Sequence, residues 1–389
     1  MERASAHLLQ NYRQQPVVVE RGLGARVWDV DGKSYLDLLG GIATCALGHC
    51  HPEVVAAVKA QADKLWHISN VFYSLPQIEL AEKLTSASGL ERAFFCNSGA
   101  EANEALFKLA RKVSKDRGHP GRFEIICFEN SFHGRTLATV AATGQPKYHQ
   151  GFEPLPSGFL HVPYGDLEAV RGAVTAKTAA VIVEPIQGEG GVKVAPAGFL
   201  KGLRSLCDEL GLLLLIDEVQ TGMGRTGEIF AYQHAGILPD AISLAKALGN
   251  GLPIGAMLCR EELGKSLKSG SHGSTFGGNL LAATAANVAF SIIRQPETLA
   301  MVRAKGEHLF QAARKLQARY PERASAVRGR GLLMGVEVVD AAAVVNRCRE
   351  GGMLVNLAGE KTVRFAPPFT VTTEELDEGM RIFEQALSA

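Results

Sequence analysis

The feature that most constrains the fold is the apolar run LLLLI at residues 212–216, which Asp217 follows directly. A short, uninterrupted apolar run bounded by Gly211 and a charged residue is typical of a parallel strand buried on both faces. Strands of this kind build open α/β sheets, in which ligands bind at the carboxyl ends of the strands. We therefore expect a mostly parallel sheet with Asp217 at its ligand-binding edge.

The next expected strand, near residues 241–245, leads into Lys246 within the segment SLAKALGNGLPIGAM. Taken alone, Asp217 reads as a helix N-cap or a strand-end ion pair, and Lys246 as an ordinary surface lysine. Together they place a carboxylate and an amine at successive strand ends. Pyridoxal phosphate requires this pair, a lysine for a Schiff base and an acid opposite the pyridinium nitrogen. The two residues therefore indicate a pyridoxal phosphate site.

Short apolar segments alternate with helical stretches through the middle of the chain. We expect strands at Ala93–Cys96, Glu124–Phe128, Ala179–Val183, Leu212–Ile216 and Ala241–Leu244. This alternation is typical of a mostly parallel sheet wrapped by helices. The pattern also predicts an amphipathic helix from Pro52 to Trp66 and long helices from about Leu280 to Ala318. The expected fold is α/β, with a large domain around the sheet and a smaller α+β domain that the N-terminal strands join.

The composition excludes several classes of function. The chain has 389 residues, 46% of them hydrophobic, which is enough for two domains with sizeable cores. A net charge of +1 gives no attraction to nucleic acid or to an anionic membrane, and no apolar run is long enough to span a bilayer. Seven scattered cysteines without a CxxC pair indicate reduced thiols and a cytoplasmic location. We interpret the segment His49–His51 as a turn and expect no metal site.

The segment CNSGAEAN resembles an anion-binding turn between a strand and a helix. Ser98, Gly99 and Ala100 stand where the helix is expected to begin, so free backbone N–H groups and the helix dipole can hold a phosphate. The alternative is that Ser98 is only an N-cap, with Glu101 completing a capping box. The turn matches neither the dinucleotide-binding glycine pattern nor the P-loop lysine motif.

The segment ENSFHGRT follows the strand expected at 124–128. Phe132 can stack on a flat cofactor there, and Arg135 can bind a carboxylate through two parallel hydrogen bonds. The alternative is a buried phenylalanine and a solvated arginine. His133 is a weaker candidate for a general base, because a lysine released from its Schiff base can itself move the proton.

Further polar residues follow other strands or lie in glycine-rich loops. Glu184 stands at the end of the strand expected at 179–183, and Glu189 lies in the loop GEGG, where it can reach an arginine. Ser274 and Thr275 belong to a hydroxyl-rich loop suited to a phosphate. Arg364, in VRFAPP, is a candidate for a second carboxylate site.

The motifs NSGAEAN, FHGRT, EPIQGEGG, IDEVQTGMGRTG, LAKALGNGLPIGA and STFGGN together resemble the class III, ornithine-type aminotransferases of pyridoxal phosphate fold type I. The resemblance runs over nearly the whole chain. It implies that Lys246 carries the Schiff base and moves the proton, and that Asp217 keeps the pyridine nitrogen protonated. It also implies that Phe132 and Val219 cover the two faces of the ring and that Gln220 faces the 3-hydroxyl group.

The same resemblance implies the remaining contacts. The cofactor phosphate is expected to bind Ser98, Gly99 and Ala100, together with Thr275 of the partner subunit, and Glu184 to support the cofactor. A homodimer with shared active sites follows from that placement of Thr275. The implied division is an N-terminal segment at 1–47 that packs with the small domain, a large cofactor-binding domain at 48–283 and a small C-terminal domain at 284–389.

The implied reaction transfers the terminal amine of N2-acetyl-L-ornithine to 2-oxoglutarate, a step of arginine biosynthesis. Substrate is expected to bind Arg135 and Ser274, with Arg364 on the α-carboxylate, and Glu189 to mask an arginine when the donor is present. Ornithine δ-aminotransferases place a tyrosine seven residues before the first histidine of GHCHP, where this chain has Ile42. The missing hydroxyl favours an acylated ornithine. The pair Thr44–Cys45 departs from the usual Val–Asn or Val–Thr, which leaves acyl-group recognition open.

Other readings stay open at this point. Succinylornithine, succinyl-diaminopimelate, ornithine or 4-aminobutyrate are alternative donors, and a mutase or decarboxylase on the same fold is a different enzyme class. Two arginines with a glutamate partner favour transamination, since one site must accept both a donor and a keto acid. A nucleotide-dependent dehydrogenase or a binding module lacks support, because the dinucleotide fingerprint is absent.

Overall fold

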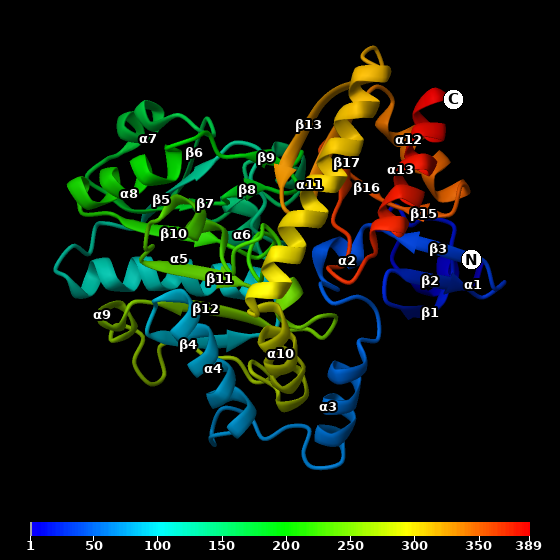
Figure 1. Cartoon of the computed structure of the whole chain (residues 1–389). Coiled ribbons are helices and arrows are strands. Elements are labelled where there is room, and N and C mark those ends of the chain that lie inside the picture. The colour runs from blue at the N-terminus through cyan, green and yellow to red at the C-terminus, as the bar shows by residue number, and fades with distance from the viewer. Residues whose placement is uncertain (1) are drawn as a thin grey trace.

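The computed structural model describes residues 2–389, which form two lobes connected by the long helix α11 and by the segment that precedes α3 (Figure 1). The large lobe contains a seven-stranded sheet in the order β4-β12-β11-β10-β7-β5-β6. Its strands are β4 (Arg92–Cys96), β5 (Glu124–Phe128), β6 (Phe159–Val162), β7 (Thr178–Val183), β10 (Leu213–Asp217), β11 (Ala241–Leu244) and β12 (Gly255–Cys259). Within this sheet β12 alone runs antiparallel to its neighbours, so the expected mostly parallel sheet is confirmed.

Helices cover both faces of this sheet, as the apolar strands require. The helices of the large lobe are α3 (Pro52–Ala62), α4 (Leu75–Ser88), α5 (Gly99–Asp116), α6 (Leu137–Ala142), α7 (Leu167–Ala173), α8 (Phe199–Leu210), α9 (Glu261–Gly264) and α10 (Leu280–Ile293). In β10, Leu213 and Leu215 pack in the core that contains α5, whereas Leu214 and Ile216 pack in the core that contains α8. Burial on both faces explains why the strand has no polar residue before its last position.

The small lobe contains two four-stranded sheets. One has the order β13-β14-β17-β16 and the other β1-β2-β3-β15. Their strands are β1 (Val19–Leu23), β2 (Arg26–Asp29), β3 (Ser34–Asp37), β13 (Ala324–Arg330), β14 (Leu333–Val338), β15 (Met353–Leu354), β16 (Asn356–Ala358) and β17 (Thr362–Phe365). The helices are α1 (Glu2–His7), α11 (Pro296–Arg319), α12 (Ala341–Glu350) and α13 (Thr373–Ser388), and a short turn, α2 (Gly40–Ala43), precedes α3.

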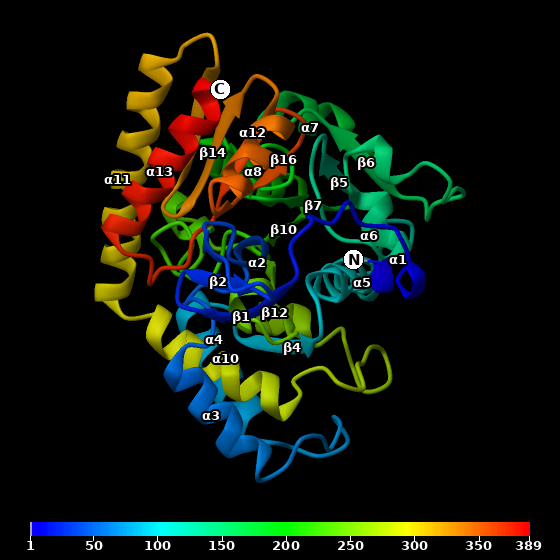
Figure 2. The ribbon, with the colours of Figure 1, turned by 90° about the vertical axis from the view of Figure 1, so that its right-hand side faces the viewer.

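The small lobe has its own hydrophobic core, to which both ends of the chain contribute. Leu36 of β3 is buried there with Met353 of β15, and the two residues are paired in the sheet. Figure 2 shows α11 and α13 side by side on the outer face of this lobe, and they are in contact. The helix α11 also joins the two cores, because its Val302 packs in the large lobe and its Leu309 in the small one.

One expected helix ends earlier than predicted, and two strands of the large sheet were not predicted. The helix that begins at Pro52 ends at Ala62 rather than at Trp66, because the chain turns at Asp63 and the Trp66 indole donates to the Ala62 carbonyl at 2.7 Å. The strands β6 and β12 were not predicted from the sequence.

None of the helices within residues 2–389 is both long and apolar enough to cross a membrane.

Candidate active site

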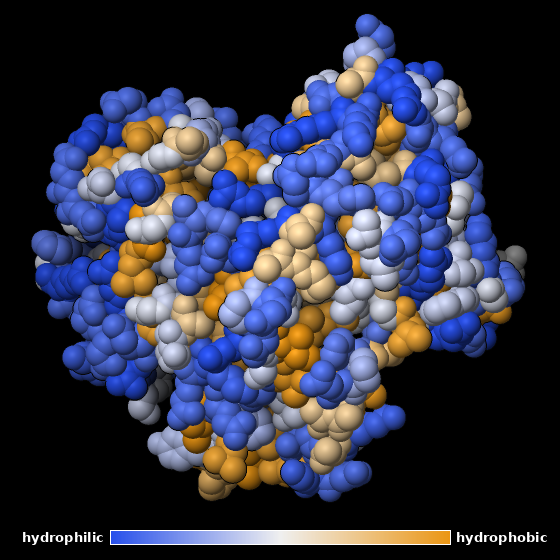
Figure 3. Space-filling view, viewed as in Figure 1, coloured by the Kyte–Doolittle hydropathy of each residue, from blue (hydrophilic) through white to orange (hydrophobic). Residues whose placement is uncertain are grey.

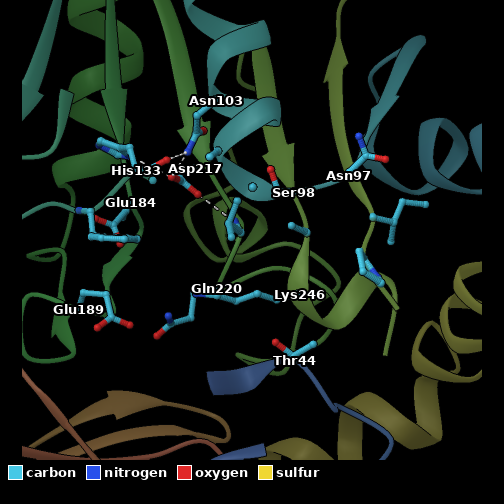
Figure 4. Close-up of a pocket in the computed structure, with 18 of the residues that line it drawn as sticks. Thr44, Asn97, Ser98, Asn103, His133, Glu184, Glu189, Asp217, Gln220 and Lys246 are labelled. Atoms are coloured by element: carbon cyan, nitrogen blue, oxygen red, sulfur yellow. Dashed lines mark hydrogen bonds and ion pairs between the residues drawn. The ribbon is translucent and has the colours of Figure 1, made fainter. Parts of the chain in front are cut away.

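A cavity of about 390 Å³ opens at the carboxyl edge of the seven-stranded sheet (Figure 4). It lies where β4, β5, β7, β10 and β11 end, because neighbouring parallel strands deliver their following residues to one edge. The predicted residues that line it are Ser98, Gly99, Ala100, Phe132, Glu184, Glu189, Asp217, Val219, Gln220 and Lys246. The cavity is therefore assembled from segments that are far apart in the sequence.

Asp217 is a buried carboxylate held by hydrogen bonds. Its Oδ2 accepts from Asn103 Nδ2 at 2.7 Å and lies 2.8 Å from His133 Nδ1, while its Oδ1 accepts from the Val219 backbone N–H at 3.0 Å. Since a carboxylate only accepts, the His133 Nδ1 carries a proton. Burial alone would lower the pKa of His133, but the hydrogen bond and charge of Asp217 outweigh it and the pKa is raised. These contacts fix the orientation of the Asp217 carboxylate at the cavity wall.

Lys246 follows β11 by two residues, on the strand that pairs with β10. It begins the short 3₁₀ turn η3 (Lys246–Leu248), and its φ of +46° is left-handed, which is unusual for a residue with a side chain. Burial lowers the pKa of Lys246, although the charge of Glu189 acts in the opposite direction. A lower pKa increases the neutral fraction of the amine, the form that reacts as a nucleophile.

The turn from β4 into α5 provides an anion site at the cavity wall. Ser98 is the N-cap of α5, and its Oγ accepts from the Glu101 N–H at 3.2 Å. The capping box considered from the sequence would have Glu101 accept from the Ser98 N–H. In the structure the Glu101 carboxylate accepts from the Asn97 N–H instead, at 2.8 Å. A Cβ at Gly99 would lie 2.8 Å from the Val219 side chain, so only glycine fits between the turn and Val219.

Phe132 and Glu184 are linked across two strand ends. The Phe132 N–H donates to Glu184 Oε1 at 2.9 Å, and both residues line the cavity. Burial raises the pKa of Glu184 to about 7. Val219 lines the same cavity, so the two residues expected to cover a flat ring are both present.

Glu189 and Arg364 form an ion pair between the lobes. Arg364, on β17 of the small lobe, is fully buried, and its Nη1 donates to Glu189 Oε1 at 2.5 Å and to Gln220 Oε1 at 3.0 Å. Its Nε donates to Asn356 Oδ1 at 3.2 Å, and its Nη2 has no hydrogen-bond partner among residues 2–389. Burial alone would raise the pKa of Glu189, but Arg364 holds it below its usual value. The predicted glutamate–arginine pairing is therefore present, and the arginine is Arg364.

The other predicted residues lie outside the cavity lining. Arg135 is exposed, with its guanidinium 4.1 Å from the centre of the Tyr148 ring. Ser274 Oγ accepts from Asn97 Nδ2 at 3.2 Å, so it lies beside the cavity behind Asn97. Thr275 is exposed and does not line the cavity of its own chain.

Sequence reasoning missed several lining residues. Asn103 is one of them, and Asn97 and the segment 251–254 are others. A signal existed for Asn103, because it is four residues after Gly99 and therefore on the same face of α5, among apolar neighbours. Thr44 was considered from the sequence only in connection with acyl-group recognition, and the structure places it at the cavity wall.

Comparisons with known proteins agree with this geometry. The family described as aminotransferase class-III matches residues 8–387. The chain is 69% identical to the acetylornithine aminotransferase of Myxococcus xanthus, over 97% of this chain and 94% of that protein. The similar solved structures include two of named activity. N-acetylornithine aminotransferase from Stenotrophomonas maltophilia has a TM-score of 0.84 and 41% identity, over 97% of each chain.

The second structure is the ornithine aminotransferase from Toxoplasma gondii, with a TM-score of 0.96 and 34% identity, over 100% of this chain and 93% of that one. That structure holds pyridoxal phosphate at partial occupancy in its active site. The fold of the present chain is accordingly that of the fold type I transferases, as predicted. The chain belongs to the class-III aminotransferases, a family of pyridoxal phosphate-dependent transaminases.

Proposed function

We propose that the chain transfers the terminal amine of N2-acetyl-L-ornithine to 2-oxoglutarate, yielding N-acetyl-glutamate semialdehyde and glutamate. The observation that carries the proposal is the ion pair of Glu189 and Arg364 above the cavity that contains Lys246 and Asp217. Such a pair lets one site bind both a dicarboxylate, whose second carboxylate can pair with Arg364, and a monocarboxylate, in whose presence Glu189 pairs with Arg364. The names of the relatives support acetylornithine as the donor.

The donor groups of the cavity fit pyridoxal phosphate. Lys246 is a half-buried amine for the aldehyde, and Asp217 is a buried carboxylate for the pyridine nitrogen. Phe132 and Val219 would lie on the two faces of the ring, with Gln220 at the 3-hydroxyl group. The backbone N–H groups at the start of α5, at Ser98, Gly99 and Ala100, would hold the phosphate, with Thr275 of the partner subunit. Glu184 would support the ring through its bond to the Phe132 N–H.

When bound, pyridoxal phosphate supplies a conjugated ring that takes up the electron pair released at the amine-bearing carbon. The protein supplies the proton transfer and the charge that favours it. Lys246, whose pKa burial lowers, can take the proton from that carbon and return it elsewhere. Asp217 stabilises a positive charge on the ring nitrogen, and Asn103 and His133 fix its orientation.

The Glu189–Arg364 pair gives a physical reason for dual specificity. The buried Arg364 would be an uncompensated charge if it faced the apolar chain of a monocarboxylate donor, which is costly. Glu189 removes this cost by pairing with it. When 2-oxoglutarate enters, its second carboxylate can take the place of Glu189. Arg135 and Ser274 would then hold the other end of either substrate.

The donor end of the cavity favours an acylated ornithine. Ile42 stands where ornithine δ-aminotransferases carry a tyrosine, and it offers no hydroxyl to a free α-amine. Thr44 lines the cavity nearby and is the polar group available to an acyl amide. We place the reaction in the cytoplasm, on the basis of the scattered cysteines.

We further propose a homodimer in which Thr275 of the partner subunit completes each phosphate site. Large apolar side chains are exposed along residues 65–78, including Val71, Tyr73 and Leu75. This segment contacts the Thr275 loop, because the His67 and Phe276 rings lie 4.9 Å apart. Figure 3 shows hydrophobic residues at the lower edge of the molecule, where Figure 1 places α3, α4 and the loop between them. An exposed apolar surface of this kind marks a protein interface.

A panel of amine donors with 2-oxoglutarate as the common acceptor tests the proposal. We expect acetylornithine to give the highest kcat/KM, ahead of succinylornithine, succinyl-diaminopimelate, ornithine and 4-aminobutyrate. A panel in which free ornithine leads would refute the assignment of the donor. Formation of glutamate in each reaction checks the acceptor.

A further inference from the structure

A second cavity, of about 330 Å³, lies at the junction of the two lobes, apart from the reaction cavity. We call it the hairpin cavity, because its wall includes Ile186 and Val194, which pair at the base of the hairpin of β8 (Ile186–Gln187) and β9 (Lys193–Val194). The beginning of α8 and the 3₁₀ turn η2 (Ala231–Ala235) form further walls. Arg330, at the end of β13, lines the cavity on the side of the small lobe. Figure 1 shows β13 reaching β9 between the lobes.

All the charged or titratable side chains that line the hairpin cavity are basic. They are Lys201 from α8, His234 from η2 and Arg330 from β13, and no aspartate or glutamate is among the lining residues. Within the part of the chain that the structure describes, neither Lys201 nor Arg330 forms an ion pair. Burial lowers the pKa of His234, and the charge of Arg330 lowers it further, although the nearby Glu228 acts in the opposite direction. Glu228 itself lies 3.8 Å from Arg303. The cavity therefore carries unneutralised positive charge.

Apart from Thr226, whose hydroxyl lies 3.1 Å from His234 Nε2, the rest of the wall is apolar. Ile186, Val194 and Leu200 contribute side chains, and prolines and alanines fill the space between them. A concave apolar wall with a few basic groups at its edge matches a ligand that has a hydrocarbon body and a carboxylate. We propose that the hairpin cavity is a second ligand site, which binds a small aliphatic carboxylate and through it adjusts the position of Glu189.

The path from this cavity to the reaction cavity is short. The hairpin whose base forms the wall carries Glu189 in its loop, three residues after Ile186 and five before Val194. The strand that carries Arg330 also holds this loop, because Arg328 Nε donates to the Gly191 carbonyl at 2.7 Å. A carboxylate bound to Arg330 while its hydrocarbon body contacts Ile186 would thus connect the small lobe to the base of the hairpin. Coupling of this kind needs an element that both sites contact, and the hairpin is that element.

Only the effect on Glu189 rests on the proposed function, whereas the ligand site stands independently of it. Binding is measured on the pyridoxal phosphate-loaded protein by calorimetric titration with hexanoate, with saturating 2-oxoglutarate present to occupy the reaction cavity. We expect one saturable site in the wild type. Arg330→Gln and Lys201→Gln should each weaken hexanoate binding about tenfold, because each removes a charged hydrogen-bond donor. Arg323→Gln, an exposed arginine near the other end of β13, is the matched control and should bind as the wild type does.

The absence of a saturable site, or binding that Arg330→Gln leaves unchanged, would overturn the proposal whatever reaction the enzyme catalyses. Binding that 2-oxoglutarate abolishes equally in the wild type and in Arg330→Gln would place hexanoate in the reaction cavity and also overturn it. The coupling is tested by stopped-flow measurement of the two half-reactions with and without hexanoate. We expect saturating hexanoate to change the ratio of their rates in the wild type and in Arg323→Gln, but not in Arg330→Gln. An unchanged ratio in the wild type would refute the effect on Glu189.

Discussion

Lys246 is the residue that would supply both the nucleophile and the proton carrier of the proposed reaction. Its burial, its left-handed backbone and its position after β11 all direct one amine to the edge of the sheet. We expect Lys246→Ala to bind pyridoxal phosphate without a covalent bond and to lose turnover by about a thousandfold or more, because both the nucleophile and the proton carrier are removed. Borohydride reduction followed by peptide mapping should find the cofactor on Lys246 in the wild type and in Lys177→Ala, an exposed control. A cofactor found on another lysine would contradict the assignment.

Glu218, the residue after Asp217, is a buried acid with a structural role. It accepts from the Thr221 hydroxyl at 2.5 Å and from the Tyr232 N–H at 2.9 Å, and burial raises its pKa to about 7 from an ordinary 4.5. Because the folded protein holds this proton more tightly than the unfolded chain does, the contribution to stability is full below pH 4.5 and is lost as the pH rises through 7. The difference amounts to about 3 kcal/mol.

We therefore expect Glu218→Gln to lose less stability than the wild type between about pH 5 and pH 8, since glutamine does not titrate there. Urea unfolding at the two pH values measures this, with the exposed Glu322→Gln as a control that follows the wild type. Some pH dependence remains in the variant, because the pKa of Glu184 is also raised to about 7. A variant with the full pH dependence of the wild type would show that Glu218 does not hold the proton.

A site residue could be predicted from the sequence when the residues next to it in the chain indicated its position. Asp217 and Lys246 each follow an apolar run, and that local signal was enough to place both at one edge of the sheet. The bond between Gln220 and Arg364 joins residues that are 144 positions apart, and no local pattern encodes it. The resemblance to a family supplied Arg364 and Glu189 as candidates, and the structure shows that they pair.

Among the elements, the turn α2 has the most strained backbone. Its four residues all have φ near +60°, and the sequence includes Ile42, a β-branched residue with φ 62° and ψ 58°. Left-handed backbone costs about 1–2 kcal/mol for each residue with a side chain. Gly40 avoids this cost and is needed for a second reason, since a Cβ there would lie 2.9 Å from the Ala366 carbonyl oxygen. The strained turn leads directly into Thr44 at the cavity wall.

Asparagine adopts left-handed backbone more readily than isoleucine does. We expect Ile42→Asn to raise the free energy of unfolding by about 0.5–1 kcal/mol, because Ile42 is partly exposed and loses little burial. Val30→Asn is the control, since Val30 is also exposed but does not have a positive φ. Urea unfolding of both variants gives the comparison. Equal destabilisation by the two changes would show that the turn is not strained at Ile42.

The elements that the sequence did not predict differ physically from those that it did. β12 runs antiparallel between β4 and β11. Its residues GAMLC are apolar and buried, but they follow closely after Lys246 and the glycine-rich segment GNGLPI, so no polar residue marks where the strand begins. The edge strand β6 contains His161, which interrupts its apolar pattern. Central strands such as β7 and β10 are apolar except for one end residue, Thr178 and Asp217, because both of their faces are buried, and these strands were predicted to within about one residue.

At the scale of the whole molecule, the proposed homodimer predicts composite active sites. A Lys246→Ala chain mixed with a Thr275→Ala chain should regain activity after subunit exchange, because one site of the heterodimer carries both lesions and the other carries neither. The regained activity should approach a quarter of that of the wild type, since about half of the dimers are mixed and each has one intact site. Activity of the mixture that stays at the average of the two variants would contradict shared sites, as would a catalytically competent monomer in sedimentation.

The central claim is that one cavity serves both substrates because Glu189 of the large lobe covers or releases Arg364 of the small lobe. Stopped-flow measurement of the two half-reactions, with acetylornithine and with 2-oxoglutarate, tests it most directly. Glu189→Ala should slow the acetylornithine half-reaction by about tenfold or more, because Arg364 is left buried and unpaired, and should leave the 2-oxoglutarate half-reaction unchanged or faster. Arg135→Ala should weaken both. Equal losses in the two half-reactions of Glu189→Ala would contradict the account and leave Glu189 as a structural carboxylate.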